Sequence, residues 1–176
     1  MVVGGGASGM MAAITAAESD QVVVILEKMN RPGIKLSITG KGRGNITNTA
    51  DRETFIKNIS GGRFLNSAFG NFDNQAVINF FEGLGVATKV ERGGRVFPLS
   101  NSAKDVAHAL TRRMEELGVR VVTSAAVKKI LRRDDDFLLL TTAGDFAADK
   151  VVLATGGASY PGAGSSGDGY ELARSL

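Results

Sequence analysis

The sequence predicts an α/β domain with a parallel central sheet, covering helices and a small antiparallel β-meander. Three observations predict it. A short apolar strand, a glycine-rich turn and a helical run follow one another within residues 2–19. The runs 22–26, 119–123 and 151–154 predict buried strands, and the first and last of them are continuously apolar, which is typical of strands covered by helices on both faces. Two more strand patterns lie between the last two runs and predict the meander.

The first turn of the chain has the spacing G-x-G-x-x-G, at Gly4, Gly6 and Gly9. In a dinucleotide site the first glycine allows a tight turn, the second lets the backbone approach a pyrophosphate, and the third lets the helix pack on the strand. The helix N-terminus adds free N–H groups and a partial charge of about +0.5 e. The alternative is a glycine-rich turn that binds no ligand.

A helix and a second buried strand complete a βαβ unit. The helix, residues 7–19, has one apolar stripe, made of Met10, Ala13, Ile14 and Ala17. Glu27 ends the strand 22–26, where an acidic residue of this fold accepts hydrogen bonds from the adenosine ribose and disfavours a 2′-phosphate. The alternative is an ordinary surface glutamate beside Lys28.

The segment 31–49 has no helical or strand period, so a long loop is expected there. A long loop inside a compact domain is usually functional. It combines four glycines with cations, Lys35, Lys41 and Arg43, and with polar residues around Asn45. Cations and polar groups among glycines suit an anionic or polar ligand lying along the backbone. A solvated surface loop is the alternative.

The middle of the chain predicts helices and a hairpin. Residues 52–86 are expected to be helical, with Asp73 as the cap of the last helix. A Gly-Gly turn predicts a hairpin within 86–98, and a further helix is expected over 103–117. The phenylalanines of this region, Phe80, Phe81 and Phe97, are expected to serve packing.

The last part of the chain predicts the meander and a glycine-rich end. Strands are expected at 126–132 and 137–142, joined by a solvated turn at 134–136 whose aspartates lack the spacing of a metal site. The strand 151–154 ends in Ala-Thr-Gly, and a helix is expected near Asp168, whose carboxylate is a candidate helix cap. An antiparallel insertion before the last strand argues against a simple NAD dehydrogenase.

Composition excludes several classes of function. The chain has 176 residues, no cysteine and a net charge of +3, so thiolate metal sites and a cysteine nucleophile are excluded and no basic stripe suggests nucleic acid. No secretory signal or membrane-length apolar run is present, so a cytoplasmic protein is expected. The single histidine, His108, is expected on a solvated helix face.

Several motifs together resemble known flavoproteins. The turn Gly4–Gly9, Glu27 and the strand end Ala154-Thr155-Gly156 resemble the FAD-binding domain of the glutathione-reductase-like flavoproteins. Longer motifs at 38–48, 93–100 and 154–170 resemble a bacterial and archaeal family of FAD-dependent oxidoreductases. Its members are described as aminoacetone-oxidase-like, as NAD(FAD)-utilising dehydrogenases or as bile-acid flavin reductases.

The resemblance implies a Rossmann-like fold, an FAD cofactor and a set of cofactor-binding residues. The glycine turn would hold the pyrophosphate, Glu27 the ribose, and Val127 the adenine through its backbone. The complete implied set is Gly4, Gly6, Ala7, Ser8, Gly9, Glu27, Lys28, Lys35, Gly42, Arg43, Asn45, Val127, Thr155, Gly156, Gly157, Gly167 and Asp168.

The chain departs from the family pattern in two ways. Gly44 stands where members commonly have a cysteine, so a thiol is missing there while the FAD motifs are retained. Family members are longer, so we expect residues 1–176 to be part of the FAD/NAD(P)-binding domain, incomplete at its C-terminus and without the inserted second domain.

These observations predict an FAD-dependent oxidoreductase that transfers hydride to a small-molecule substrate, with NADH or NADPH as possible electron donors. No side chain stands out as an acid or base, and Tyr160 and Asp168 are candidates near the flavin. No metal, nucleic-acid or membrane partner is expected, and the oligomeric state is left open. The alternatives are an NAD-binding Rossmann dehydrogenase, a non-catalytic nucleotide-binding module and an RNA-modifying flavoenzyme, for which the modest charge gives no support.

Overall fold

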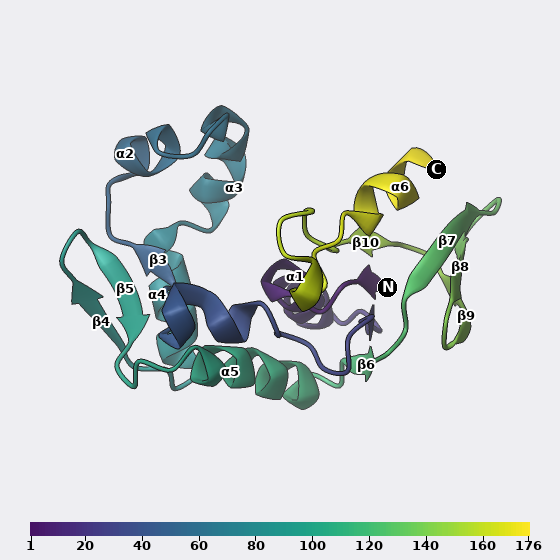
Figure 1. The fold of residues 1–176 in the computed structure, drawn as a ribbon, viewed down its shortest axis with the longest axis horizontal. Helices are drawn as coiled ribbons and strands as arrows, with labels where there is room; N and C mark the ends of the chain where they lie inside the picture. Colours follow the sequence, from purple (N-terminus) through teal and green to yellow (C-terminus); the bar gives the residue numbers. More distant parts are fainter. The chain divides into compact units, whose positions relative to one another are not determined.

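The computed structural model describes all residues, 1–176, and they form two compact units. The first unit consists of Met1–Leu36 and Leu110–Leu176, and the second is Ser37–Ala109. In Figure 1 the first unit includes the purple start and the green-to-yellow end of the chain. Both glycine-rich ends of the predicted cofactor site therefore belong to one unit.

The first unit contains a parallel sheet of four strands in the order β10-β1-β2-β6 (Figure 1). The strands are β1 (Val2–Val3), β2 (Val24–Leu26), β6 (Arg120–Val122) and β10 (Val152–Leu153). Helix α1 (Ala7–Ala17) joins β1 to β2 and buries Met10, Ala13 and Ile14, so the predicted βαβ unit is confirmed.

The central and edge strands of this sheet differ in burial. Both residues of β1 and the last two of β2 are buried, whereas β6 and β10 are half-buried or exposed because each has a neighbour on one side only. The sequence predicted buried strands at 119–123 and 151–154, whereas the residues of β6 and β10 are only partly buried or exposed. Val22 was also assigned wrongly, because the second strand begins at Val24 and the Val22 side chain is 96% exposed.

The antiparallel meander has three strands in the order β7-β8-β9. They are β7 (Val127–Arg132), β8 (Phe137–Thr141) and β9 (Gly144–Ala148), of which the sequence predicted the first two. The turn between β7 and β8 is closed by Arg133, whose Nε donates to Asp136 at 2.7 Å, while Asp134 and Asp135 are exposed. This turn is solvated, as predicted.

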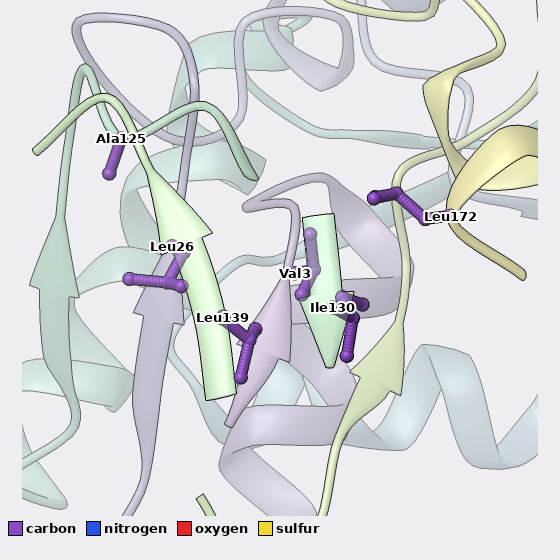
Figure 2. Packing of buried hydrophobic residues seen from close by; sticks show 6 residues of the cluster. All are labelled: Val3, Leu26, Ala125, Ile130, Leu139 and Leu172. Carbon is purple, nitrogen blue, oxygen red and sulfur yellow. The ribbon is translucent and has the colours of Figure 1, made fainter. Parts of the chain in front are cut away.

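One apolar cluster joins the meander and the last helix to the parallel sheet (Figure 2). Helix α6 (Asp168–Arg174), which follows the short helix η3 (Pro161–Ala163), contributes Leu172. The six buried members are Val3, Leu26, Ala125, Ile130, Leu139 and Leu172. Because the cluster draws on β1, β2, β7, β8 and α6, it fixes the elements that contain most of the predicted site residues relative to one another.

The second unit is built from short helices and a three-stranded antiparallel sheet, β3-β5-β4. The sheet strands are β3 (Thr47–Asn48), β4 (Thr88–Glu91) and β5 (Arg95–Pro98), so the predicted hairpin is confirmed. The helices before it are η1 (Leu36–Gly42), α2 (Arg52–Lys57), η2 (Gly62–Leu65), α3 (Asn66–Asn71) and α4 (Asn74–Gly83).

The helical region 52–86 contains the predicted cap and the predicted packing. The Asp73 carboxylate accepts from the Ala76 N–H at 2.8 Å and begins α4. Phe80 and Phe81 lie edge to face with ring centroids 5.3 Å apart, and Phe97 is 3% exposed, so these rings serve packing as predicted.

Helix α5 (Ala103–Glu116) follows the hairpin, and the boundary between the two units falls inside it. The predicted helix is confirmed, and one face of it is buried through Ala103, Val106, Ala107, Leu110 and Met114. His108 is exposed, as predicted. No helix of the chain has the length and apolar character needed to cross a membrane.

The close packing of α1 on β1 generates a first prediction. A Cβ added at Gly9 would overlap the Gly4 carbonyl oxygen, which is backbone and cannot swing away. Gly9→Ala is therefore expected to lower the free energy of unfolding by about 3 kcal/mol, as overpacking of a rigid site does. Urea denaturation followed by circular dichroism measures the change.

The matched control is Gly83→Ala in α4, where an added Cβ meets nothing within 4 Å. It is expected to be neutral or stabilising by up to about 1 kcal/mol, since alanine favours helix. Equal effects of the two substitutions would contradict the steric argument.

Candidate functional site

The three motif glycines of the first turn differ in whether the fold itself requires a residue without a Cβ. Gly4 has φ +104°, and a Cβ there would lie 2.6 Å from the carbonyl oxygen of Ala154, directly after β10. Gly9 is required by its approach to Gly4. Gly6 has φ −78°, and an added Cβ would meet nothing within 4 Å. The fold itself requires Gly4 and Gly9, whereas the space beside Gly6 is open to a ligand.

Helix α1 begins at this open space, and no side chain caps its N-terminus. Gly6 is its N-cap, no side chain accepts a hydrogen bond from its first turn, and that turn contains no acidic residue. Ala7 and Ser8, the first helical residues, are exposed. Backbone N–H groups and the helix dipole therefore make this end suitable for an anion such as a pyrophosphate.

Glu27 ties the glycine turn to the end of β2. Its carboxylate is 8% exposed and accepts hydrogen bonds from the N–H of Gly5 at 2.6 Å and of Met29 at 2.8 Å. The reading as an ordinary surface glutamate was therefore wrong. A carboxylate offers about four acceptor positions, so two remain for hydroxyl groups of a ligand.

Lys28 and Asp168 pair with each other across the first unit. The Lys28 ammonium lies 2.5 Å from Asp168 Oδ2 and also donates to the Ser166 hydroxyl, and Ser166 donates to Asp168 at 2.7 Å. The hydrogen bond from Lys28, followed by that from Ser166, holds the pKa of Asp168 below its usual value. The ion pair is therefore complete above the ordinary pKa of an aspartate and is lost as the pH falls through the lowered pKa.

Asp168 is not a helix cap. The N-cap of α6 is Gly167, at φ +90°, and no side chain caps this helix. The interpretation of the Asp168 carboxylate as a structural cap was therefore wrong, and the ion pair with Lys28 accounts for its position.

Lys35 reaches the same glycine-rich segment from another point. Its ammonium lies 3.4 Å from the hydroxyl of the buried Ser165 and 5.9 Å from the ring centroid of Tyr160. Thr155 packs against the start of α6, where a Cβ on Gly169 would overlap its hydroxyl. Gly156, at φ +76°, is exposed and Gly157 is half-buried.

Val127 begins strand β7 and packs, half-buried, against the apolar cluster of the first unit. It pairs with Thr141 of β8, and the register shifts between Val127 and Lys129. The N–H of Ala125, just before β7, donates to the Glu27 carbonyl at 2.9 Å, which brings the start of β7 close to the end of β2.

The three remaining predicted residues, Gly42, Arg43 and Asn45, lie in the second unit. The Arg43 guanidinium stacks 4.4 Å from the Phe97 ring centroid, pairs with Glu91 and donates to Asn101 at 2.7 Å. The hydrogen bond from Arg43 is the largest cause that lowers the pKa of Glu91. These contacts attach the Arg43 loop to the hairpin and to Asn101, just before α5, and we call them the Arg43 clasp.

The backbone around Arg43 is unusual. Gly40, Lys41, Gly42 and Gly44 all have φ between +57° and +83°. At Gly42 an added Cβ meets nothing within 4 Å, and Asn45 is exposed. A Cβ on Gly44 would lie 2.9 Å from the Ala103 Cα, so this backbone has no room for the cysteine that the family commonly places there.

The structure also adds residues that sequence reasoning missed. Ser165 and Ser166 bind the two lysines, and Glu91 and Asn101 bind Arg43. The serines stand in the predicted glycine-rich motif and could have been singled out there. Nothing in the sequence pairs Arg43 with Glu91, because the pairing depends on the placement of the hairpin.

A comparison with protein families matches residues 1–176 to the family described as HI0933-like protein Rossmann domain. The chain belongs to this family. The match covers all residues and confirms both the resemblance to FAD-dependent flavoproteins and the predicted Rossmann-like α/β fold.

Two curated relatives match nearly all of the chain. A 3-dehydro-bile acid delta(4,6)-reductase from Clostridium scindens is 36% identical over 177 residues, which cover 99% of this chain. A ribosomal RNA dihydrouridine synthase from Escherichia coli is 27% identical over 174 residues, which cover 98%. The chain spans 43% of the length of each relative.

Solved structures support the same fold. The open conformation of a flavocytochrome c3 fumarate reductase superposes with a TM-score of 0.71 and 24% identity, over 98% of this chain and 39% of that one. THI4 from Thermovibrio ammonificans superposes with a TM-score of 0.61 and 16% identity, over 88% of this chain and 56% of that one. At these identities the likeness concerns the fold alone.

The Glu27 contacts generate a second prediction. In Glu27→Gln only the carbonyl oxygen still accepts, so the N–H of Gly5 or Met29 loses its partner in a buried place. The free energy of unfolding is expected to fall by about 1–3 kcal/mol without any ligand. Glu53→Gln on exposed α2 is the control, with an expected change below about 0.5 kcal/mol. An equally small effect at Glu27 would contradict a stabilising role for its two hydrogen bonds.

The Arg43 clasp generates a third prediction. Arg43→Met removes an ion pair that is partly exposed and a cation–π contact, so we expect a loss of about 1 kcal/mol in a urea titration. Arg92→Met, at an exposed arginine of the same hairpin, is expected to change stability by less than about 0.5 kcal/mol. In a double-mutant cycle with Glu91→Gln the two effects at Arg43 and Glu91 should not add, and full additivity would refute the clasp.

Proposed function

We propose that the first unit binds FAD and that the protein is an FAD-dependent oxidoreductase acting on a small molecule. The observation that carries the proposal is the open space beside Gly6 at the uncapped start of α1. A glycine without a structural reason, next to helix N–H groups, is what close approach of a pyrophosphate requires. Membership of a Rossmann family with flavoprotein motifs supports FAD as the dinucleotide.

The residues of the first unit have distinct parts in this proposal. The turn Gly4–Gly9, with the N–H groups of Ala7 and Ser8, binds the pyrophosphate, and Glu27 accepts from the adenosine ribose while it keeps Gly5 and Met29 in place. Val127 offers its backbone to the adenine. Burial of the Glu27 carboxylate strengthens its hydrogen bonds and disfavours a phosphorylated ribose, which would meet a like charge.

The flavin end is assigned to the loops after β10. Thr155, Gly156, Gly157 and Gly167 present backbone that a planar ring can approach closely. Gly42 and Asn45 of the second unit stay predicted cofactor-binding residues, and Arg43 holds their loop in shape. FAD, when bound, supplies hydride transfer, and the protein contributes binding, orientation and electrostatics.

Two kinds of relative support different reaction classes for this proposal. The 36% identical relative is named as a reductase of a 3-dehydro-bile acid, which favours reduction of a small organic substrate. NADH or NADPH is the donor in this proposal. A second candidate is modification of RNA, favoured by the relatives named as ribosomal RNA dihydrouridine synthases, at 27% and 23% identity. The net charge of +3 gives RNA little electrostatic support.

A titration with FAD tests the proposal. Purified protein is expected to bind FAD, seen as quenching of flavin fluorescence, and Gly6→Val is expected to weaken binding at least tenfold because its side chain fills the space for the phosphates. The stability of Gly6→Val should fall by no more than about 1 kcal/mol, since the change affects only the N-cap. Gly83→Val in α4 is the matched control and should bind FAD like the unmodified protein.

Other outcomes would replace the proposal. Tight binding of NAD without FAD would indicate a Rossmann dehydrogenase. Bound FAD that neither NADH nor NADPH reduces would indicate a non-catalytic nucleotide-binding module.

A further inference from the structure

The segment Gly156–Gly167, which we call the C-terminal loop, has almost no apolar anchor. Ser165 is its only buried residue, and Tyr160 is 55% exposed. Within the loop, Tyr160 and Ser165 form a backbone pair in which the Ser165 N–H donates at 3.0 Å. Glycine-rich backbone loses much entropy on ordering, so this loop depends on contacts with the rest of the unit.

The charged contacts come from one short segment, Lys28–Lys35, which follows β2. Lys28 reaches Asp168 and Ser166 at the far end of the loop. The loop backbone also lies directly on this segment, because a Cβ on Gly164 would stand 3.3 Å from Met29 Cγ and 3.5 Å from Lys28 Cε. Bulk at Gly164 would lift the loop away from the Lys28 stem.

Lys35 makes the second attachment. Its ammonium faces the Ser165 hydroxyl at 3.4 Å and the face of Tyr160 at 5.9 Å from the ring centroid. Ser165 in turn lies beside Gly156, where an added Cβ would stand 3.2 Å from the Ser165 hydroxyl oxygen. Lys35 thus contacts the middle of the loop, and Lys28 contacts its end.

We propose that Lys28 and Lys35 are positioning residues, which fasten the C-terminal loop to the segment after β2 and thereby slow the dissociation of FAD. The loop contains Gly156, Gly157 and Gly167, to which the flavin end was assigned, and this part of the inference rests on the proposed function. The ammonium groups are engaged by serine, aspartate and tyrosine, so they act on the cofactor through the loop.

The fastening is electrostatic and partly open to solvent. The side chains of Lys28 and Asp168 are 25% and 41% exposed, so dissolved salt screens their attraction. An apolar anchor would not weaken in this way. Salt dependence of the loop is therefore a property that the fastening predicts and that a purely packed loop would lack.

The experiment compares Lys28→Met and Lys35→Met with the control Lys129→Met, at an exposed lysine of β7. Protein loaded with FAD is diluted into excess apo-acceptor, and the dissociation rate is read from flavin fluorescence at low and high salt. We expect about a threefold to fivefold faster release in Lys28→Met, a smaller effect in Lys35→Met and none in the control. Release from the unmodified protein should accelerate with salt, and Lys28→Arg should restore slow release.

Amide hydrogen exchange of residues 156–167, measured without FAD, separates the two proposals. Faster exchange there in Lys28→Met is expected whether or not FAD binds, so failure to bind FAD would overturn the proposed function and leave this readout intact. Unchanged exchange would overturn the fastening. Unchanged exchange combined with faster release would instead make Lys28 a direct ligand of the cofactor.

Discussion

Helix α1 lies against strand β1 at a distance that only glycine allows. The missing Cβ of Gly9 makes room for the Gly4 carbonyl, and the missing Cβ of Gly4 makes room for the backbone after β10. These two approaches place the start of α1 at the carboxyl end of the parallel sheet. The other features of the candidate site in the first unit are arranged around that point, because the ligands of such sheets bind where the strands end.

A buried carboxylate and an apolar cluster hold the surrounding elements in place. Glu27 connects the glycine turn with the segment after β2 through two backbone N–H groups. The cluster that includes Val3, Leu26 and Leu172 brings the meander and α6 to the same end of the sheet. Burial thus stabilises the glycine turn and the sheet, whereas charged contacts hold the C-terminal loop. This difference supports a fixed pyrophosphate end and a more easily released flavin end.

Much of the first unit could be predicted from the sequence. The turn Gly4–Gly9, the continuous apolar run before Glu27 and the stripe of α1 obey local rules of periodicity and close approach, and these rules hold in the structure. The ends of strands were harder to predict. Val22 continues the apolar run but is 96% exposed, because a hydrophobic pattern cannot tell where the neighbouring strand stops pairing.

The partners of charged side chains could not be predicted from the sequence, for a different reason. Lys28 and Asp168 are far apart in the chain, and nothing local indicates that they meet. Asp168 is a residue type that commonly caps helices, yet the N-cap of α6 is Gly167 and the Asp168 carboxylate pairs with Lys28. Arg43 has the pattern of a ligand-binding cation, and nothing local indicates that its guanidinium packs on Phe97. Such pairings are set by the tertiary fold, which local periodicity does not encode.

A crystal structure of the protein with FAD tests the central claim most directly. The account predicts the pyrophosphate within hydrogen-bond distance of the first-turn N–H groups of α1, beside Gly6. It also predicts the adenosine ribose on Glu27, whose hydrogen bonds from Gly5 and Met29 are retained. A dinucleotide bound elsewhere, or a Glu27 carboxylate that leaves the glycine turn without touching the ribose, would contradict it.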